Sequence, residues 1–201
     1  MKSVRTASAR RPGVQIPVGG LLVLGGPPLE GKGVLAARLT EWLPFAIKIE
    51  TVDHLTHEDE LWCRDGPTEP AVKDPLPGML ALARRIWDGR QPAEPPVIVL
   101  AARCATPGAR SRAAATARAA GMKFLFVEVR SSQIRALRRI TVAGLSSGQT
   151  VSRIELYEKI LARYQPLSDA ETRRFRSVRL KRALGNLEGA LERVLRAWRT
   201  G

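Results

Sequence analysis

The sequence is poor in cysteine, in long apolar runs and, over its second half, in acidic residues. Its two cysteines, Cys63 and Cys104, are too few for a disulfide framework or a zinc site. No stretch approaches the roughly 20 apolar residues that a membrane-spanning helix needs. We therefore expect a protein of the reducing cytoplasm that does not interact with membranes.

The first 13 residues, MKSVRTASARRPG, also contain no acidic residue. Their composition resembles that of a transit peptide, but no secretory core follows, and a solvated arm is the simpler interpretation. We expect a disordered basic arm over residues 1–18. The whole chain has 201 residues, of which 44% are hydrophobic. We therefore predict that residues 19–201 form one domain with one core.

Basic residues are concentrated in the second half of the chain. Residues 1–100 contain 12 basic and 12 acidic residues, whereas residues 101–201 contain 21 basic and 7 acidic ones, which accounts for the net charge of +14. Such asymmetry favours an anionic partner, namely a nucleotide, a nucleic acid or an acidic protein. A preference for arginine on solvated helix faces explains it equally well.

Hydrophobic periodicity predicts strands that alternate with helices of ten or more residues. Expected strands cover residues 21–25, 45–50, 96–102, 123–129 and 175–180, and expected helices cover 32–42, 78–87, 107–120, 131–143, 151–164 and 186–198. Residues 144–150 have the composition of a mobile loop. This alternation predicts a three-layer α/β fold, with a parallel sheet of about five strands and helices on both faces.

A glycine-rich loop follows the first expected strand. Residues 26–32 fit the first seven positions of the phosphate-binding pattern G-x-x-x-x-G-K-[ST]. In such a loop the backbone N–H groups turn toward an anion, the lysine reaches the outer phosphates, and the next helix adds its positive end. The alternative is a tight turn without a ligand. The candidate nucleotide-binding residues are Gly26, Pro27, Pro28, Leu29, Glu30, Gly31, Lys32 and Gly33.

The eighth position of the pattern is Gly33, where a functioning loop has a Ser or Thr hydroxyl that holds Mg²⁺. The pattern therefore predicts binding of ATP or another nucleotide and leaves the Mg²⁺ ion uncertain. Both histidines, His54 and His57, lie in an acidic stretch that is more simply a solvated loop than a metal site, so we assign no metal ligand.

Four stretches together resemble the P-loop kinases of the zeta-toxin and polynucleotide-kinase-like group. They are the phosphate loop, Asp53 after the second strand, residues 96–129, and the segment YEKILARYQPL at residues 157–167. The resemblance covers roughly residues 20–199. It implies the P-loop NTPase fold and a kinase-like domain with a lid-like segment at about residues 131–165.

The resemblance also implies roles for particular side chains. Asp53 matches the catalytic base that takes the proton from the substrate hydroxyl, and Lys32 matches the lysine that acts on the transferred phosphoryl group. Arg135, Arg138 and Arg139 match the lid arginines that clamp phosphates. From the residues alone, Asp53 is equally a helix N-cap, and the arginines equally form a solvated basic face.

The departures from the family pattern all concern catalysis. Gly33 replaces the Mg²⁺-binding hydroxyl, residues 99–103 lack the Asp that usually ends the third strand, and Thr56 stands where an Arg often follows the base. Since phosphoryl transfer depends on a positioned Mg²⁺, the sequence predicts a nucleotide-binding, kinase-like protein with impaired phosphotransfer.

We therefore predict an interaction or regulatory module whose basic half contacts an acidic protein. Two alternatives stay open. One is an active ATP-dependent kinase for a small molecule or a nucleic-acid end, with Mg²⁺ held by the nucleotide and by Asp53 or Glu50. The other is a nucleic-acid-binding protein with a vestigial loop. The second rests on six basic residues around the single aromatic Phe175: Arg173, Arg174, Arg176, Arg179, Lys181 and Arg182.

Overall fold

The computed structural model describes residues 19–43, 45–50, 75–90, 95–130, 132–145, 150–181 and 185–200. In chain order the described elements are β1 (Gly20–Gly25), α1 (Lys32–Trp42), β2 (Ala46–Glu50), α3 (Leu76–Asp88), β3 (Val97–Ala101), α4 (Pro107–Ala119), β4 (Lys123–Arg130), α5 (Gln133–Leu145), α6 (Thr150–Arg163), α7 (Asp169–Arg174), β5 (Ser177–Lys181) and α8 (Leu187–Arg199).

The five strands form one parallel sheet in the order β2-β3-β1-β4-β5. Strand β1 lies at the centre, and every residue in it is buried because helices cover both faces of the sheet. From β1 the chain builds β2 and β3 on one side and then β4 and β5 on the other. The loop after β1 therefore lies where the strand order reverses, the usual position of ligand sites in open α/β sheets.

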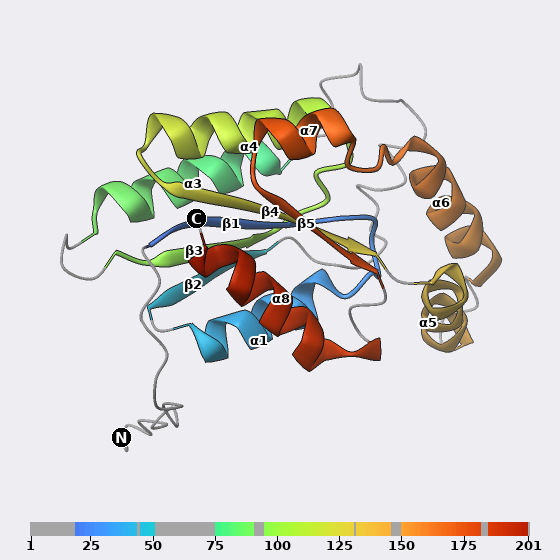
Figure 1. Ribbon diagram of the computed structural model, residues 1–201. Coiled ribbons are helices and arrows are strands. Elements are labelled where there is room, and N and C mark those ends of the chain that lie inside the picture. Colours follow the sequence, from blue (N-terminus) through green and yellow to red (C-terminus); the bar gives the residue numbers. More distant parts are fainter. Residues whose placement is uncertain are drawn as a thin grey trace, which may run out of the picture.

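Two helical layers enclose the sheet, as Figure 1 shows. Helices α3, α4 and α7 cover one face, and α1 and α8 cover the other. Side chains alternate along each strand, so β4 sends Phe126 into the first apolar core and Val127 into the second. This arrangement confirms the predicted three-layer α/β fold with a five-stranded parallel sheet.

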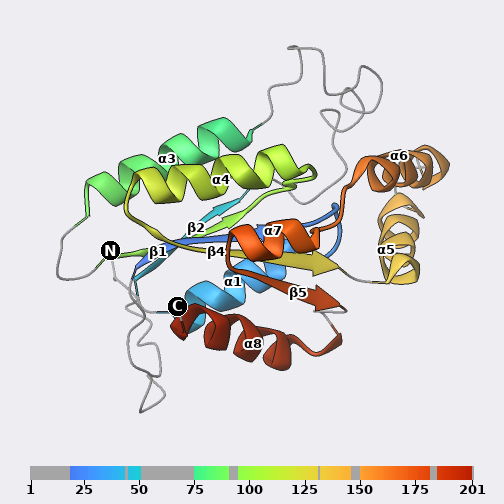
Figure 2. The ribbon, with the colours of Figure 1, turned by 45° about the horizontal axis from the view of Figure 1, so that its top comes forward.

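Helices α5 and α6 lie beyond the carboxyl ends of the strands, outside the two layers (Figures 1 and 2). We call this pair the lid. A small apolar cluster centred on the buried Ala136, Ile140 and Tyr157 joins the two helices. Among the described residues, no helix combines the length and the apolar character needed to cross a membrane.

Most predicted elements are confirmed to within two residues at either end. The predicted mobile loop over residues 144–150 is wrong at both of its ends, because α5 continues to Leu145 and α6 begins at Thr150. The packing of α5 against α6 outweighs the roughly 1 kcal/mol helix penalty of Gly144.

Helix α7 was not predicted from the sequence. Ser168 accepts a hydrogen bond from the backbone N–H of Glu171, and the Glu171 carboxylate accepts one from the N–H of Ser168. This reciprocal arrangement is a capping box, and its Ser-x-x-Glu spacing is visible in the sequence. Helix α8 is confirmed together with its predicted cap, since Asn186 Oδ1 accepts from Gly189 N.

Candidate functional site

The loop between β1 and α1 has a backbone that depends on glycine at two positions. Gly26 has φ +149°, and a Cβ there would lie 2.2 Å from the carbonyl oxygen of Val129. Gly31, the N-cap of α1, has φ +91°. Both values lie where L-amino acids with side chains are disfavoured. The glycine positions of the sequence pattern are thus the positions at which this backbone requires glycine.

Lys32 is the first residue of α1 and is only 4% exposed. Its Nζ donates a hydrogen bond to the carbonyl oxygen of Pro27 at 2.6 Å, so the loop wraps around the ammonium group. The N-terminal end of α1 adds its own partial positive charge at the same place. This is an arrangement that favours a phosphate group in the loop.

The lid contacts the loop through one of the three predicted arginines. Arg139 Nη1 donates to the carbonyl oxygen of Leu29 at 2.5 Å. Arg135 instead lies against Gly185, where an added Cβ would be 3.1 Å from Arg135 Nη1. Arg138 is exposed on α5. Of the predicted lid arginines, Arg139 is therefore the one that the fold brings to the loop.

A second contact joins the loop to α6. Glu30 is only 2% exposed, and Tyr157 donates its hydroxyl hydrogen to Glu30 Oε1 at 3.3 Å. Burial, and then the charge of Glu30, raise the pKa of the Tyr157 hydroxyl well above its usual value, so this group remains a hydrogen-bond donor. The side chain of Leu29 packs against the lid cluster.

The end of β2 brings a carboxylate to the position that lacks the hydroxyl. A Cβ built at Gly33 would lie 3.3 Å from Glu50 Oε2. Glu50 is also the register partner of Ala101, the last residue of β3. Its other oxygen, Oε1, accepts a hydrogen bond from Lys48 Nζ at 2.8 Å. Glu50 is thus adjacent both to Gly33 and to Ala101, the last residue of β3.

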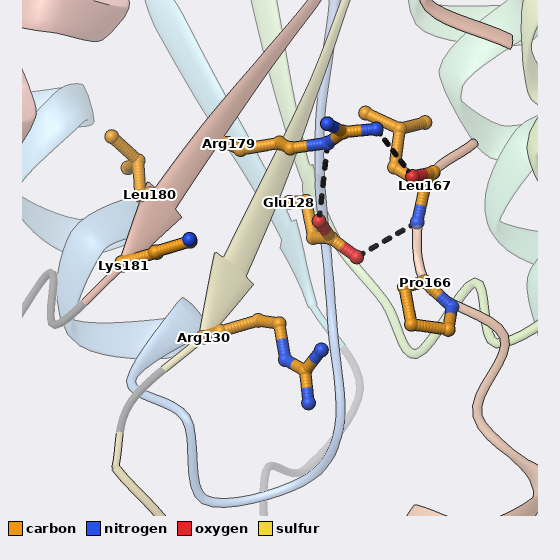
Figure 3. Close-up of a pocket in the computed structure, with 7 residues that line it drawn as sticks. All are labelled: Glu128, Arg130, Pro166, Leu167, Arg179, Leu180 and Lys181. Atoms are coloured by element: carbon orange, nitrogen blue, oxygen red, sulfur yellow. Dashed lines mark hydrogen bonds and ion pairs between the residues drawn. The ribbon is translucent and has the colours of Figure 1, made fainter. Parts of the chain in front are cut away.

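The ends of β4 and β5 border a cavity of about 260 Å³, shown in Figure 3. On its wall the buried Glu128 accepts hydrogen bonds through Oε1 from the Tyr164 hydroxyl at 2.8 Å and from Leu167 N at 3.0 Å. Arg179 Nε lies 3.9 Å from Glu128 Oε2, and Arg179 Nη2 donates to Leu167 O at 2.5 Å. These contacts fasten the segment that leaves α6 to the edge of the sheet.

A buried ion pair also supports the segment that follows α6. Arg110 of α4 is fully buried and donates two hydrogen bonds to Glu171 of α7, from Nε at 2.7 Å and from Nη2 at 2.9 Å. Arg110 Nη1 also donates to the carbonyl oxygens of Gln165 at 2.8 Å and of Cys104 at 3.2 Å. Arg110 thus joins α4, α7, the end of the lid and the segment after β3.

Several solved structures share this arrangement. A Kti12 protein from Chaetomium thermophilum, in complex with ADP-AlF3, has a TM-score of 0.63 at 18% identity, over 88% of this chain and 95% of that one. A sugar kinase from Janibacter sp. HTCC2649 has a TM-score of 0.58 at 16% identity, over 89% of this chain and 93% of that one. A gluconokinase from Sinorhizobium meliloti 1021 has a TM-score of 0.53 at 15% identity, over 93% of this chain and 92% of that one.

This chain has the P-loop kinase fold. Identities of this size show the fold alone. No protein-family model and no curated protein sequence matches the chain. The assignment to the zeta-toxin and polynucleotide-kinase-like group, and the loss of its metal-binding motifs, therefore stay predictions.

Within the P-loop kinase fold, the predicted site residues separate into three groups. The loop residues and Arg139 lie together, and Arg135 and Arg138 lie elsewhere on α5. Asp53, the predicted base, lies outside the described residues, as do His54 and His57.

Two residues that the sequence singled out are part of the core. Phe175 packs edge-on against Phe124, with ring centroids 5.6 Å apart, so it cannot stack on a base. Cys104 is buried, as expected for a small apolar side chain.

Four residues that form buried polar contacts near the site were not singled out from the sequence: Tyr157, Glu128, Arg110 and Glu171. A charged residue within an apolar strand, such as Glu128 in KFLFVEV, is a signal of a buried polar network. The bonds between Arg110 and Glu171 have no such signal, because 61 residues separate the two side chains.

Proposed function

We propose that this protein binds ATP or another nucleoside triphosphate at its phosphate loop, and that Lys32 is the phosphate ligand. The observation that carries the proposal is the buried ammonium group of Lys32, held inside the loop at the N-terminus of α1. Arg139 lies at the same loop. The similar Kti12 fold was solved with ADP-AlF3, which supports nucleotide as the ligand class.

We further propose that phosphotransfer is impaired and that the protein acts as a nucleotide-responsive interaction module. Gly33 has no side-chain oxygen, and β3 ends in Ala101, without a carboxylate. Among the described residues, no cluster of three or more His, Cys, Asp or Glu side chains could hold a metal ion. Without a protein ligand at these two positions, Mg²⁺ would be held less firmly, and the transition state would be less well stabilised.

Glu50 favours a second candidate function, an active kinase. Its Oε2 atom approaches the place of the absent hydroxyl at Gly33, and Glu50 is the register partner of Ala101 at the end of β3. A carboxylate oxygen suits Mg²⁺. In this alternative, Glu50 replaces both missing ligands and positions the metal ion for phosphoryl transfer to a small molecule or a nucleic-acid end.

Titration of ATP with and without Mg²⁺ separates the two functions. If phosphotransfer is impaired, the ATP affinity of the wild type is expected to change little on addition of Mg²⁺. If Glu50 holds the ion, Mg²⁺ strengthens ATP binding and Glu50→Gln reduces that gain by roughly ten- to a hundredfold. Glu41→Gln, which neutralises an exposed carboxylate on α1, is the control. A strong Mg²⁺ effect that persists in Glu50→Gln would contradict a metal-binding role of Glu50.

For the interaction itself we propose an acidic protein partner at the amino ends of β4 and β5. The exposed basic residues there come from α7, from the turn before β5 and from the last turn of α8: Arg173, Arg174, Arg176, Arg196 and Arg199. Burial, and then the charge of Arg176, lower the pKa of Lys123 in the same region. In Figure 1 the carboxyl end of α8 lies at the amino ends of the strands, away from the lid, so a partner there leaves the nucleotide site accessible.

Charge reversal tests this surface. Binding of a labelled polyglutamate peptide, followed by fluorescence anisotropy, is expected to weaken with salt and to fall about tenfold in the triple variant Arg173→Glu, Arg174→Glu, Arg176→Glu. Nucleotide affinity is expected to stay unchanged. The control with the same change in net charge reverses Arg38, Arg84 and Arg85 on α1 and α3. Tight binding of a short DNA duplex at physiological salt would instead favour nucleic acid.

A further inference from the structure

Leu29 occupies a backbone conformation that glycine adopts readily and leucine avoids. Its φ is +62°, in the left-handed region. That region costs an L-residue roughly 1–2 kcal/mol and glycine almost nothing. Because Leu29 lies within the phosphate loop, the conformation of the loop includes a strained residue that tertiary contacts must stabilise.

The lid makes three such contacts with the loop. The Leu29 side chain packs into the lid cluster with Ile140 of α5 and Tyr157 of α6. Arg139 donates a hydrogen bond to the Leu29 carbonyl oxygen. The next loop residue, the buried Glu30, accepts the hydrogen bond of the Tyr157 hydroxyl. The contacts of Leu29 thus hold both its side chain and its carbonyl group in place.

Building on the proposed nucleotide binding, we propose that Leu29 and Tyr157 are positioning residues through which the lid sets the phosphate-binding conformation of the loop. When the lid leaves the loop, Leu29 relaxes out of the left-handed region and the loop loses its phosphate-binding conformation. Nucleotide binding and lid closure are then coupled. Because such coupling is reciprocal, a partner that displaces the lid weakens nucleotide binding.

Two substitutions at position 29 separate this role from simple packing. Leu29→Ala and Leu29→Gly both remove the side chain from the lid cluster, but only glycine adopts φ +62° without strain. We therefore expect Leu29→Ala to bind ATP about tenfold more weakly than Leu29→Gly by isothermal titration calorimetry. A merely structural contact predicts the opposite order, because glycine loses more backbone entropy on ordering.

Hydrogen exchange of the α5 backbone amides reports the lid without any nucleotide. Both Leu29 variants and Tyr157→Phe are expected to exchange roughly tenfold faster in α5 than the wild type, since each removes a contact between lid and loop. The control is Ile134→Ala, which truncates an apolar side chain on α5 that is 68% exposed and lies outside the lid cluster. Its α5 amides and its ATP affinity are expected to match the wild type.

The results distinguish failure of the proposed contact between lid and loop from failure of the proposed nucleotide site. Equal ATP affinities in Leu29→Ala and Leu29→Gly, or weaker binding by the glycine variant, would overturn the positioning role of Leu29. Unchanged α5 exchange in Tyr157→Phe would overturn the role of Tyr157. If the wild type binds no nucleotide, the proposed function fails, while unchanged α5 exchange in both Leu29 variants would still refute the contact between lid and loop.

Discussion

Replacing Lys32 with alanine is expected to weaken ATP binding about a hundredfold or more. The substitution removes the charged group that the loop encloses, and with it the hydrogen bond to the carbonyl oxygen of Pro27. Losing one partner of a buried, hydrogen-bonded charge pair costs about 2–5 kcal/mol of binding free energy, and 1.4 kcal/mol corresponds to a factor of ten. Isothermal titration calorimetry with ATP, in the absence and presence of Mg²⁺, measures the loss.

Two further variants keep this result interpretable. Lys32→Met keeps most of the volume of the buried aliphatic chain and loses the charge, so it is expected to fold like the wild type and to bind ATP as poorly as Lys32→Ala. Lys159→Ala removes an exposed lysine of α6 and is expected to leave ATP binding unchanged. If Lys32→Met folds and binds ATP with wild-type affinity, the nucleotide binds elsewhere, for example in the cavity lined by Arg130, Arg179 and Lys181.

Breaking the ion pair between Arg110 and Glu171 is expected to have the largest effect on stability. Arg110→Met leaves a carboxylate buried without its partner, which lowers the free energy of unfolding by about 3–5 kcal/mol. For a domain of this size the midpoint of thermal unfolding should fall by roughly 10 °C, as circular dichroism would show. Arg118→Met removes an exposed arginine of the same helix and is expected to change stability by at most about 0.5 kcal/mol.

The double variant Arg110→Met, Glu171→Leu tests the mechanism of this loss. With both charges replaced by apolar side chains, no buried charge is left unpaired, and part of the lost stability should return. The return cannot be complete, because Glu171 also caps α7. Stability of Arg110→Met equal to that of the wild type would show that the buried pair contributes nothing to the folded state.

The same pair makes stability depend on acid pH. Burial alone would raise the pKa of Glu171, but hydrogen bonds from Arg110 and Ser168 outweigh it and lower the pKa from 4.5 to about 2. The folded state therefore binds this proton less readily than the unfolded state. The stabilisation is complete above about pH 4.5 and is lost as the pH falls toward 2. Urea unfolding at several pH values should show this loss in the wild type and a smaller one in Arg110→Met.

Elements with strong local patterns were predictable from the sequence. The apolar run of β1 and the glycine spacing after it predicted a buried strand followed by a phosphate-type loop, and the glycines have the positive φ values that the pattern requires. Helix α7 has a local signal as well, the Ser-x-x-Glu spacing of its capping box. That helix was missed because a six-residue helix is too short for hydrophobic periodicity to detect.

The basic residues around Phe175 no longer indicate a base-stacking site, because the burial of an aromatic ring cannot be read from its neighbours in the sequence. Phe175 is surrounded in the sequence by arginines and lysines, which is a pattern of nucleic-acid binding when the aromatic side chain is exposed. In the fold its ring packs on Phe124 and Phe126 in the core. The basic side chains around it that the structure describes are exposed, and they retain only their charge as a means of recognition: Arg173, Arg174, Arg176, Arg179 and Lys181.

The sequence by itself determined the α/β alternation, the central strand and the glycine and lysine positions of the phosphate loop, since these depend on spacing within a few residues. Only the tertiary structure decided that Arg139 lies at the loop, that Glu50 approaches Gly33 and that Tyr157 binds Glu30. Residues 30 and 157 are separated by 127 positions. Their distance depends on the order of the strands and on how the lid helices pack, and no local pattern specifies either of these.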